Sequence, residues 1–268
     1  MNLHKAEIVG LEPVSLNWNL LTIRPEEKAE FGPGQFIYLR LSPMTDPLLR
    51  RPFSVHGFCK SSNHLEVLFQ DKGKGTRLMK GYRSGDEIDF LGPLGNGFNL
   101  SKIKKKAALV GGGIGVAPLF FLAHELHKSG VSFDFLMGAS TKEVIPSSGY
   151  FEKHQITPYL ATDDGSSGFQ GTVTALFKNL YGCSGENKEL DMVYACGPTP
   201  MLKTLYNESE SLQIPIEVSL EANMACGVGA CLGCVCRLKE ENSPQETYGR
   251  VCKEGPVFPG EAVFFSER

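Results

Sequence analysis

The cysteines are the most informative residues of this sequence, because their spacing is one that holds iron and sulfide. Five of the eight cysteines fall within the segment from Cys226 to Cys252. Cys226, Cys231 and Cys234 follow a C-x4-C-x2-C pattern, and seventeen residues separate Cys252 from the third of them. This is the plant-type [2Fe–2S] pattern, in which four thiolates hold two irons. We therefore expect Cys226, Cys231, Cys234 and Cys252 to be the metal ligands.

The loop around these cysteines is built of small residues. Gly227, Gly229, Ala230 and Gly233 leave room for backbone N–H groups to approach the sulfides, and such hydrogen bonds help to set a cluster's potential. A structural zinc site is the alternative, but zinc modules usually show two separate pairs of cysteines. The fifth thiol, Cys236, is expected to be a packed free thiol. The sequence leaves open whether it replaces the third ligand.

A second group of residues has the chemistry to bind a flavin. Pro52 follows two arginines and fixes the chain direction, and Arg51 could pair with a pyrophosphate. Ser54 could hydrogen-bond the edge of a flavin ring. Further on, a turn containing Gly75 and Thr76 can present backbone N–H groups to a phosphate. Taken alone, the two arginines are equally consistent with a pair of exposed side chains before a strand that bind no cofactor.

Together, the two motifs resemble the flavin site of the ferredoxin–NADP reductase superfamily, in which an R-x-[FY]-[ST] run and a following glycine turn bind FAD or FMN. The resemblance implies that the strand between the motifs lies beside the flavin. The cofactor-binding residues that it implies are Arg51, Pro52, Phe53, Ser54, Leu68, Phe69, Gln70, Gly75 and Thr76.

A glycine run between an apolar strand and a helix predicts a pyridine-nucleotide site. The run contains Gly111, Gly112, Gly113 and Gly115, and a phosphate would lie at the helix N-terminus. It does not match G-x-G-x-x-G, because Val116 stands where the third glycine is needed, so an ordinary Rossmann dehydrogenase is disfavoured. The G-G-G-x-G-x-A-P form instead resembles the NAD(P)-binding half of the same superfamily.

Cys196, Gly197 and Pro198 resemble that superfamily's C-G-P motif, which packs beside the nicotinamide at the flavin face. The resemblance makes Cys196 the candidate catalytic residue and the two that follow cofactor-binding residues. For Cys196 alone, a buried thiol at a strand end is the alternative. Lys142 could meet the 2′-phosphate of NADP, but Glu143 beside it opposes one, and we expect NAD.

The composition is that of an ordinary globular protein. The 268 residues are 41% hydrophobic and 21% charged, which excludes wholesale disorder, and no apolar run is long enough for a membrane span. The net charge of -3 gives no electrostatic support for nucleic-acid binding. The N-terminus shows no secretory signal, so we expect a reducing, cytoplasmic location. The six histidines show no metal-ligand spacing, and we expect structural or solvent-facing roles.

The patterns of strands and helices predict three domains. Residues 1–100 contain short β-rich runs separated by Pro and Gly turns, which predicts an antiparallel FAD-binding β-barrel. Residues 101–216 alternate apolar strands with helices, which predicts a parallel-sheet α/β domain for NAD. Residues 217–268 hold the cysteines and form the predicted [2Fe–2S] domain. We expect strands over Leu3–Val9, Trp18–Ile23, Gln35–Leu41, His64–Gln70, Glu87–Leu91, Ala107–Val110, Phe133–Met137, Tyr159–Thr162 and Met192–Ala195, and helices over Pro118–Lys128, Leu176–Leu180 and Met201–Glu210.

The order of the motifs predicts a chain of electron carriers. A hydride carries two electrons and a [2Fe–2S] cluster exchanges one at a time, and a flavin can do both. Across almost the whole chain, the combination resembles the electron-transfer subunits of NAD-dependent dihydroorotate dehydrogenase. The gap before the last cysteine is longer than that family's pattern, and one cysteine is extra. Three further stretches carry the resemblance: Ala161–Ser166, Met224–Cys231 and Val251–Phe258.

The resemblance implies three cofactors: FAD, one [2Fe–2S] cluster and NAD. It also implies a heterotetramer with an FMN-containing catalytic subunit, which oxidises dihydroorotate to orotate while this chain passes the electrons to NAD. We find no dihydroorotate site in this sequence, which agrees with substrate chemistry in a partner. The exposed side of the cysteine loop, around Val228 and Leu232, is the expected partner face.

Two other functions stand beside this interpretation. The small flavin/iron–sulfur subunit of a ferredoxin–NADP transhydrogenase or a sulfide dehydrogenase would resemble this chain in its first two domains. A non-cysteine cluster ligand would favour that function, whereas all four candidates here are cysteines. A non-catalytic redox sensor would need no nicotinamide pocket, so the C-G-P motif argues against it.

Overall fold

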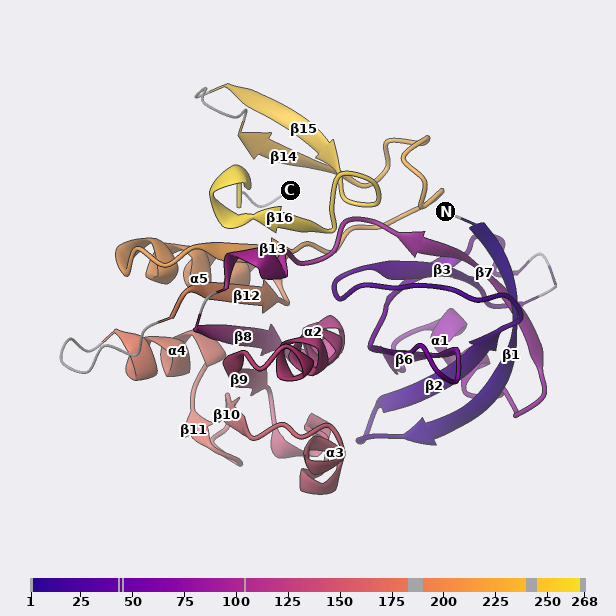
Figure 1. Ribbon diagram of the computed structural model, residues 1–268, viewed down its shortest axis with the longest axis horizontal. Helices are drawn as coiled ribbons and strands as arrows, with labels where there is room; N and C mark the ends of the chain where they lie inside the picture. Colours follow the sequence, from indigo (N-terminus) through magenta and orange to yellow (C-terminus); the bar gives the residue numbers. More distant parts are fainter. Residues whose placement is uncertain are drawn as a thin grey trace.

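The computed structural model describes residues 2–42, 44, 46–103, 105–182, 190–239 and 245–265, which form three parts (Figure 1). A curled antiparallel sheet lies beside a mostly parallel sheet flanked by helices, and the C-terminal segment lies against both. This arrangement confirms the predicted multi-domain class of β-barrel, parallel-sheet α/β unit and small C-terminal module. Within the described ranges, no helix combines the length and the apolar character needed to cross a membrane.

The first part is a seven-stranded antiparallel sheet that curls into a barrel. Its elements are β1 (Asn2–Pro13), β2 (Trp18–Pro25), β3 (Phe36–Arg40), β4 (Arg51–Ser54), β5 (Gly57–Cys59), β6 (His64–Gln70), the short helix α1 (Lys74–Met79) and β7 (Glu87–Leu94). The strand order is β4-β3-β7-β1-β2-β6-β5, and β4 also touches β6. Alternate side chains point inward, so that Ile8, Leu21 and Phe90 fill the interior. All five predicted strands are present, and the structure adds β4, which carries the arginine–proline motif, and the short β5.

The second part is a seven-stranded sheet in which every strand but the last is parallel to its neighbours. In chain order its elements are η1 (Leu100–Lys102), β8 (Lys106–Gly112), η2 (Gly113–Val116), α2 (Ala117–Lys128), β9 (Ser132–Ala139), η3 (Lys142–Val144), α3 (Ser148–Lys153), β10 (Pro158–Thr162), β11 (Phe169–Gln170), α4 (Val173–Tyr181), β12 (Met192–Cys196), α5 (Thr199–Ser211), β13 (Ile216–Ser219), β16 (Val257–Pro259) and η4 (Gly260–Ala262). The strand order is β11-β10-β9-β8-β12-β13-β16. The chain runs outward from β8 to β11 and then returns to place β12 on the other side of β8. The switch point between β8 and β12 is where such sheets bind ligands.

The C-terminal segment is held at both ends by this second sheet. Strand β13 pairs in parallel with β12, and β16 pairs antiparallel with β13. Between them lie the cysteine loop and a hairpin of β14 (Val235–Lys239) and β15 (Glu246–Arg250). The expected boundary at residue 217 therefore falls inside a strand of the nucleotide sheet, and the cysteine segment is an insertion between two of its strands. The three-domain division itself stays a prediction.

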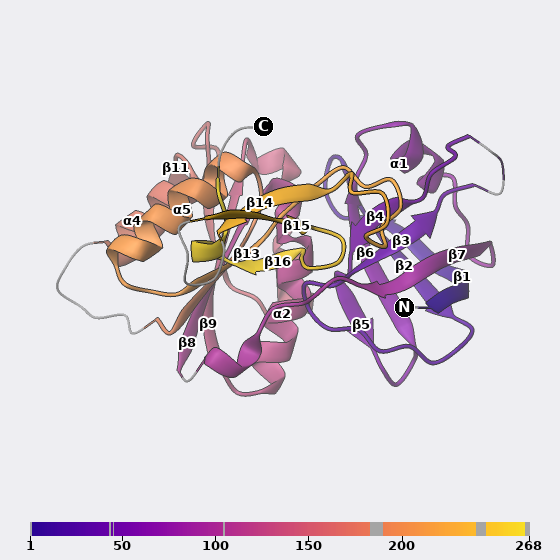
Figure 2. The same ribbon diagram turned by 90° about the horizontal axis from the view of Figure 1, so that it is seen from above.

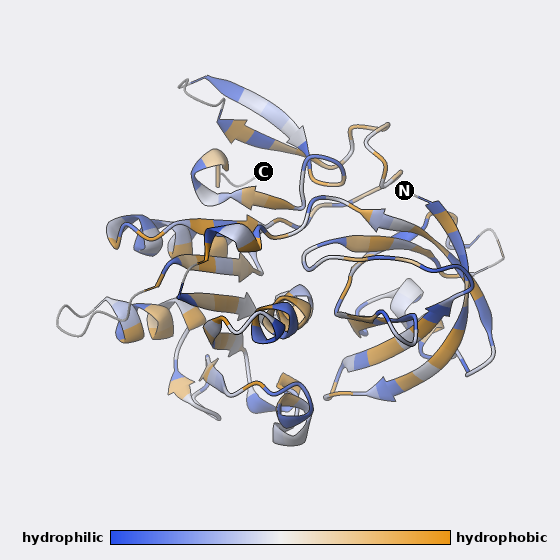
Figure 3. Cartoon of the chain, viewed as in Figure 1, coloured by the Kyte–Doolittle hydropathy of each residue, from blue (hydrophilic) through white to orange (hydrophobic). Residues whose placement is uncertain are grey.

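The hydrophobic residues are concentrated where the two large sheets form the core (Figure 3). Hydrophobic colouring is concentrated on the strands of the two large sheets, whereas β15 is blue to white. Helix α2 is buried along most of its length, because it lies between the nucleotide sheet and the barrel (Figure 1). Its Leu119 and Phe120 share one apolar cluster with Trp18 and Leu20 of β2. Each such fully buried side chain contributes roughly 1.5–3 kcal/mol, so the two parts are joined by a continuous core.

His56 adds a directional polar contact to this apolar interface. It follows β4 by two residues and is 1% exposed. Its Nδ1 lies 2.9 Å from the carbonyl oxygen of Ala117 at the start of α2, and its Nε2 lies 2.7 Å from the hydroxyl of Tyr150 in α3. Because a carbonyl oxygen can only accept, Nδ1 carries the proton and Nε2 accepts from Tyr150. Burial, together with the nearby His154 and Lys153, lowers the pKa of His56 to about 3, so the ring is neutral.

The neutral His56 makes stability depend on pH. The unfolded chain takes up a proton at this ring below about pH 6.5, whereas the fold holds the ring unprotonated down to about pH 3. Its contribution to stability is therefore complete above about pH 6.5 and is lost as the pH falls towards 3. His154, with its pKa lowered to about 4 by burial, acts in the same direction. We expect His56→Gln to reduce by about one the number of protons taken up on unfolding between about pH 6.5 and 4, as measured by urea unfolding at a series of pH values.

The matched control is His127→Gln, because His127 is an exposed histidine of α2. That variant should keep the pH dependence of the parent protein. If His56→Gln kept it as well, the buried neutral role assigned to His56 would be wrong.

Candidate functional site

The glycine run and the C-G-P turn meet at the switch point between β8 and β12. A Cβ atom placed on Gly115 would lie 2.5 Å from the carbonyl oxygen of Cys196 and 2.8 Å from Cα of Gly197. A Cβ on Gly112 would lie 2.5 Å from Sδ of Met201 in α5. At Gly115 the neighbouring atoms are backbone and no side chain fits, so the two turns approach each other this closely only because this position is glycine.

Open backbone lies beside this contact. Gly113 has a φ of +54°, which favours glycine, and nothing lies within 4 Å of the position a Cβ would take. Gly111, in contrast, packs against Val116, and a Cβ there would lie 2.4 Å from Cγ1 of that side chain. Phosphates of a nucleotide can therefore approach the backbone where η2 leads into α2. The structure brings the predicted nucleotide-binding glycines to one place, and their individual roles stay predictions.

Cys196 ends β12 at the centre of this contact and is 3% exposed. Burial raises the pKa of its thiol to about 12, and the nearby carboxylate of Glu221 adds to the effect. The thiol is therefore uncharged at neutral pH. A small, uncharged side chain followed by Gly197 and Pro198 allows a planar ring to lie close to the turn, which is the surface that the predicted role of these three residues requires.

The two arginines at the start of β4 have different surroundings. Arg50 forms an ion pair with Asp89 of β7 and donates to that residue's carbonyl oxygen at 3.1 Å. Arg51 donates to the carbonyl oxygens of Leu49 at 2.8 Å and of Arg50 at 3.1 Å. Gly75 lies close by, since a Cβ there would be 3.9 Å from Cγ of Arg51. Both arginines thus make contacts within the fold, and the stem of the Arg51 side chain passes beside the glycine turn, where the motif predicts that an anion is bound.

The glycine turn is closed by Thr76. Its Oγ1 accepts from the backbone N–H groups of Lys72 and Gly73, both at 3.0 Å, and donates to the carbonyl oxygen of Gly73 at 3.1 Å. Those two N–H groups are satisfied within the chain. A phosphate would therefore meet the N–H groups of Lys74, Gly75 and Thr76, which the first turn of α1 leaves without helical partners. The Thr76 hydroxyl shapes the turn, a role that the spacing of the motif did not reveal.

The other predicted flavin contacts lie on the neighbouring strands β4 and β6. Leu68 and Phe69 of β6 are 3% and 2% exposed, and the ring of Phe69 packs edge-on against Phe53 with centroids 6.3 Å apart. The side chains of Leu68 and Phe69 thus belong to the core, which leaves their backbone for a cofactor. The remaining candidates, Pro52, Ser54 and Gln70, are half-buried.

The four cysteines of the predicted cluster lie as two pairs. Sγ of Cys226 accepts from the N–H groups of Cys231 at 3.4 Å and of Val228 at 3.5 Å. Sγ of Cys234 accepts from the N–H group of Cys252 at 3.4 Å. The hydrogen bonds to Cys226, first that from Val228, lower the pKa of its thiol to about 6, whereas burial raises that of Cys252 to about 12. Two pairs of thiols are what a [2Fe–2S] unit requires, because each of its two irons takes two protein ligands.

The arrangement of the four cysteine thiols as two pairs can be compared with the ligand set of a structural zinc site. In the part of the chain that the structure describes, no three Cys, His, Asp or Glu side chains are placed to hold a single metal ion. A structural zinc ion needs four ligands around one centre. The two pairs are nevertheless neighbours, since Cys226 acts electrostatically on Cys252. Two neighbouring pairs of thiols match the two protein ligands that each iron of a [2Fe–2S] unit takes.

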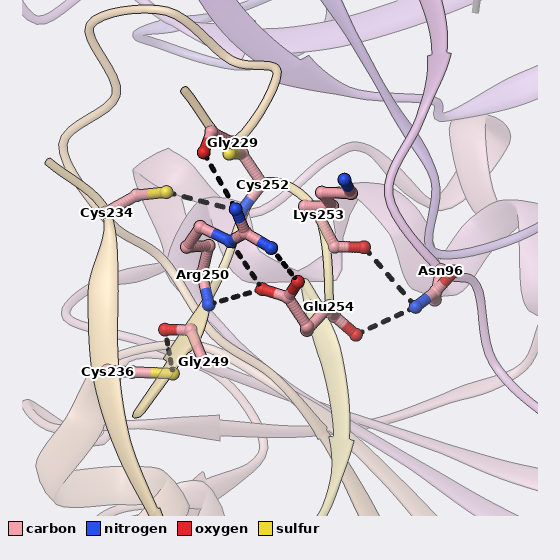
Figure 4. A network of polar contacts seen from close by, with 9 residues as sticks. All are labelled: Asn96, Gly229, Cys234, Cys236, Gly249, Arg250, Cys252, Lys253 and Glu254. Atoms are coloured by element: carbon pink, nitrogen blue, oxygen red, sulfur yellow. Dashed lines mark hydrogen bonds and ion pairs between the residues drawn. The ribbon is translucent and has the colours of Figure 1, made fainter. Parts of the chain in front are cut away.

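A chain of hydrogen bonds joins both cysteine loops to the barrel (Figure 4). Nη1 of Arg250 donates to the carbonyl oxygen of Gly229 at 2.9 Å, and its Nε donates to Oε2 of Glu254 at 3.0 Å. Asn96, which follows β7, donates to the carbonyl oxygens of Glu254 at 2.8 Å and of Lys253 at 3.4 Å. The turn after the fourth cysteine is thus fixed both to the first cysteine loop and to the barrel. The cysteine spacing in the sequence did not point to Arg250, Glu254 or Asn96.

Cys236 lies apart from the four paired thiols. It is in β14 opposite Gly249, and its Sγ donates to the carbonyl oxygen of Gly249 at 3.4 Å. In Figure 4, the side chain of Arg250 lies between Cys236 and the pair of Cys234 and Cys252. Cys236 also lines a cavity of about 690 Å³ between the hairpin and the C-G-P turn. This placement favours Cys234 as the third ligand, which stays a prediction.

The chain is similar in sequence to a family of known proteins. The family model for the iron–sulfur cluster binding domain of dihydroorotate dehydrogenase B matches residues 221–264. The chain is 41% identical over 227 residues to the dihydroorotate dehydrogenase B (NAD(+)) electron transfer subunit of Desulforamulus reducens, covering 85% of this chain and 84% of the relative. With the protein of the same name from Lysinibacillus sphaericus it is 36% identical over 260 residues, covering 95% and 96%.

Two solved structures are also similar. One is that of an NADH-dependent reduced ferredoxin-NADP oxidoreductase, studied for flavin-based electron bifurcation, with a TM-score of 0.82, 29% identity and coverage of 97% of this chain and 90% of that chain. The other is a ferredoxin NADP+ reductase from Neisseria gonorrhoeae with bound FAD and NADP, with a TM-score of 0.65, 17% identity and coverage of 82% and 100%. The second likeness concerns the fold alone.

Single thiol substitutions separate the two choices for the third ligand. We expect Cys234→Ser to lower the iron content of anaerobically purified protein from about two atoms per chain to below half of that, because one pair loses a thiolate. Cys236→Ser should keep both the iron content and the visible spectrum, because its thiol donates to the carbonyl oxygen of Gly249 on the far side of Arg250 from the pair of Cys234 and Cys252. Iron and sulfide analysis with absorption spectra makes the measurement. Loss of iron from Cys236→Ser with retention in Cys234→Ser would reassign the ligand.

Proposed function

The chain belongs to the family of dihydroorotate dehydrogenase B (NAD(+)) electron transfer subunits, and we propose that it carries electrons to NAD from an FMN-containing catalytic partner within a cytoplasmic heterotetramer. It is the electron-transfer component of an NAD-linked oxidoreductase of pyrimidine biosynthesis. Its cofactors are FAD, a [2Fe–2S] cluster and NAD. We further propose which residues of this chain serve each cofactor and which surface meets the partner.

One observation carries the proposal: the barrel touches both other functional parts at the strand with the arginine–proline motif. After β4, His56 contacts the start of α2, next to the nucleotide-binding glycines. Beside β4, Tyr38 of β3 contacts the cysteine loop. A bound flavin exchanges hydride with NAD and single electrons with an iron–sulfur centre, so its binding strand has to lie between the two.

The predicted residues have surroundings that match their roles. Arg51 holds a pyrophosphate, because the stem of its side chain passes beside the glycine turn and a guanidinium suits phosphate oxygens. A Cβ on Gly75 would lie 2.5 Å from Cδ1 of Leu41, so glycine lets the turn pack against that side chain. Ser54, half-buried at the end of β4, reaches the ring edge. Cys196 and Gly113 form the nucleotide side, the former as an uncharged thiol at the ring and the latter as open backbone for phosphate.

The tip of the cysteine loop is the proposed contact with the catalytic partner. Leu232 is 61% exposed, and its φ of +57° lies in the left-handed region that bulky side chains avoid. Val228 lies half-buried in the same loop. A large apolar side chain that is held outward on strained backbone is well placed to be buried in a complex.

The state of the thiols supports the proposed compartment. None of the seven cysteines in the described part of the chain forms a disulfide. Thiolates that bind iron have to stay reduced, and reducing conditions are those of the cytoplasm.

The likeness to the ferredoxin-NADP oxidoreductase structure favours a second candidate function. With a TM-score of 0.82 over 97% of the chain, the same three parts could serve a different electron-transfer partner. The 36–41% identity to dihydroorotate dehydrogenase B subunits favours the first function, as does a candidate ligand set made only of cysteines.

Anaerobic titration with nicotinamide nucleotides tests the nucleotide end of this function. We expect NADH to bleach the flavin absorbance and then the cluster absorbance. NADPH should be weaker by about tenfold or more in apparent affinity, because the carboxylates of Glu143 and Asp164 lie near one another beside Lys142 and repel a 2′-phosphate. Equal reduction by the two nucleotides would contradict the NAD preference. A colourless protein, or one that neither nucleotide reduces, would contradict the function.

Charge substitution at the loop tip tests the partner surface. Leu232→Glu should weaken binding to the dihydroorotate-oxidising subunit by at least about tenfold, because a carboxylate would be buried in the interface. The control is Leu16→Glu in the turn between β1 and β2, where a leucine is 71% exposed next to η3 and away from the cysteine loop. Gel filtration and titration calorimetry of the mixed subunits measure the effect. Unchanged affinity in Leu232→Glu would remove the proposed contact.

A further inference from the structure

Tyr38 of β3 connects the barrel to the loop that carries the first pair of cysteines. Its hydroxyl lies 3.0 Å from the carbonyl oxygen of Met224 and 2.9 Å from that of Ala225, so one proton is shared between two acceptors directly before Cys226. The residue is 2% exposed. Burial is the main cause that raises the pKa of Tyr38, and the hydroxyl therefore stays a donor.

The loop also rests directly on the ring. Gly227 has a φ of +71°, and a Cβ at this position would lie 2.8 Å from Cδ1 of Tyr38. The residue before Cys226 is thus hydrogen-bonded to the hydroxyl, and the residue after it lies on the ring. Cys226, the first ligand, is held between two contacts with one side chain. Figure 2 shows this loop lying over the barrel near β3 and β4.

The other end of Tyr38 is anchored to the flavin-binding strand. In the sheet, Tyr38 pairs with Pro52 of β4 on one side and with Leu91 of β7 on the other. Its carbonyl oxygen lies 3.5 Å from Nη1 of Arg50, which forms the ion pair with Asp89 of β7. The backbone of Tyr38 is therefore fixed relative to the arginine–proline motif by the sheet, and its buried ring carries this position to the cysteine loop.

We propose that Tyr38 is a positioning residue that fixes the distance between the first cysteine pair and the flavin-binding strand, and through it the rate of electron exchange between the two cofactors. The inference rests on the proposed function. Electron exchange falls steeply with the separation of two centres and depends on the packing between them. A loop that slides on the barrel would therefore slow the exchange without any loss of cofactor, and Tyr38 prevents that sliding.

Tyr38→Phe is the sharpest test, because it keeps the ring against Gly227 and removes only the hydroxyl. Losing one hydrogen bond, worth about 1 kcal/mol, should speed hydrogen exchange of the backbone amides of residues 226–228 by about fivefold in the holoprotein. In anaerobic stopped-flow experiments with NADH, flavin bleaching should keep its rate while cluster bleaching slows several-fold. Tyr38→Leu, which also loses the ring, should show both effects more strongly.

The matched control is Tyr82→Phe. Tyr82 lies in the same barrel, and its hydroxyl donates to the carbonyl oxygen of Leu41 at 2.8 Å, so the variant loses a bond of the same kind away from the cysteine loop. It should leave amide exchange at residues 226–228 and the rate of cluster bleaching unchanged. A Tyr38→Phe protein that matches the parent in both measurements would overturn the inference.

The two readouts distinguish failure of this inference from failure of the proposed function. If NADH does not reduce the parent protein, the proposed function fails, whereas amide exchange still reports whether Tyr38 holds the loop. If NADH reduces the flavin in both proteins and the cluster bleaches equally fast, the function stands and the positioning role is wrong. Iron analysis of Tyr38→Phe, expected to equal that of the parent, shows that a slower cluster step does not arise from lost iron.

Discussion

A four-residue strand, β4, has to be held against two other parts of the molecule at once, and the rest of the structure depends on this constraint. On one side, His56 contacts the start of α2, and on the other, Tyr38 contacts the cysteine loop. Both are buried polar side chains whose partners lie in a different part of the fold. An unpaired buried polar group costs about 1–3 kcal/mol, so each contact favours one docking geometry over its neighbours. Apolar burial alone is non-directional and would allow the parts to slide.

Polar contacts set where the parts meet, and glycines set how closely they approach. Gly115 lies against the backbone at Cys196, and Gly227 lies against the ring of Tyr38. Gly115 lets the two turns of the predicted nucleotide site meet, and Gly227 lets the cysteine loop rest on the barrel. Glycine at these positions thus allows segments that are far apart in the sequence to come together at the predicted sites.

Local patterns predicted the barrel and the parallel sheet, because strand alternation, turn residues and helix periodicity are properties of neighbouring residues. The spacing of Cys226, Cys231 and Cys234 likewise identified one loop as a ligand candidate. Tyr38 gave no such signal, since its partners follow it by 186 and 187 positions. His56 was treated as background with the other histidines, because only the folded chain shows that its ring lies between two parts. The return of β16 to the nucleotide sheet was missed for the same reason, as three residues between turns carry no pattern of their own.

The division between internal contacts and the exposed loop tip explains how one scaffold can serve different partners. The contacts made by Tyr38, His56 and Asn96 join parts of the same chain, so they act whichever protein supplies or accepts the electrons. Leu232, by contrast, is exposed in the cysteine loop with a positive φ, where a substitution would alter the proposed partner surface and touch none of these three contacts. The similar ferredoxin-NADP oxidoreductase structure, at 29% identity over nearly the same length, agrees with a scaffold of this kind. Sequence patterns thus reveal the motifs proposed for the cofactors and also single out the loop tip at Val228 and Leu232, whereas the contacts that hold the parts together become visible only in the fold.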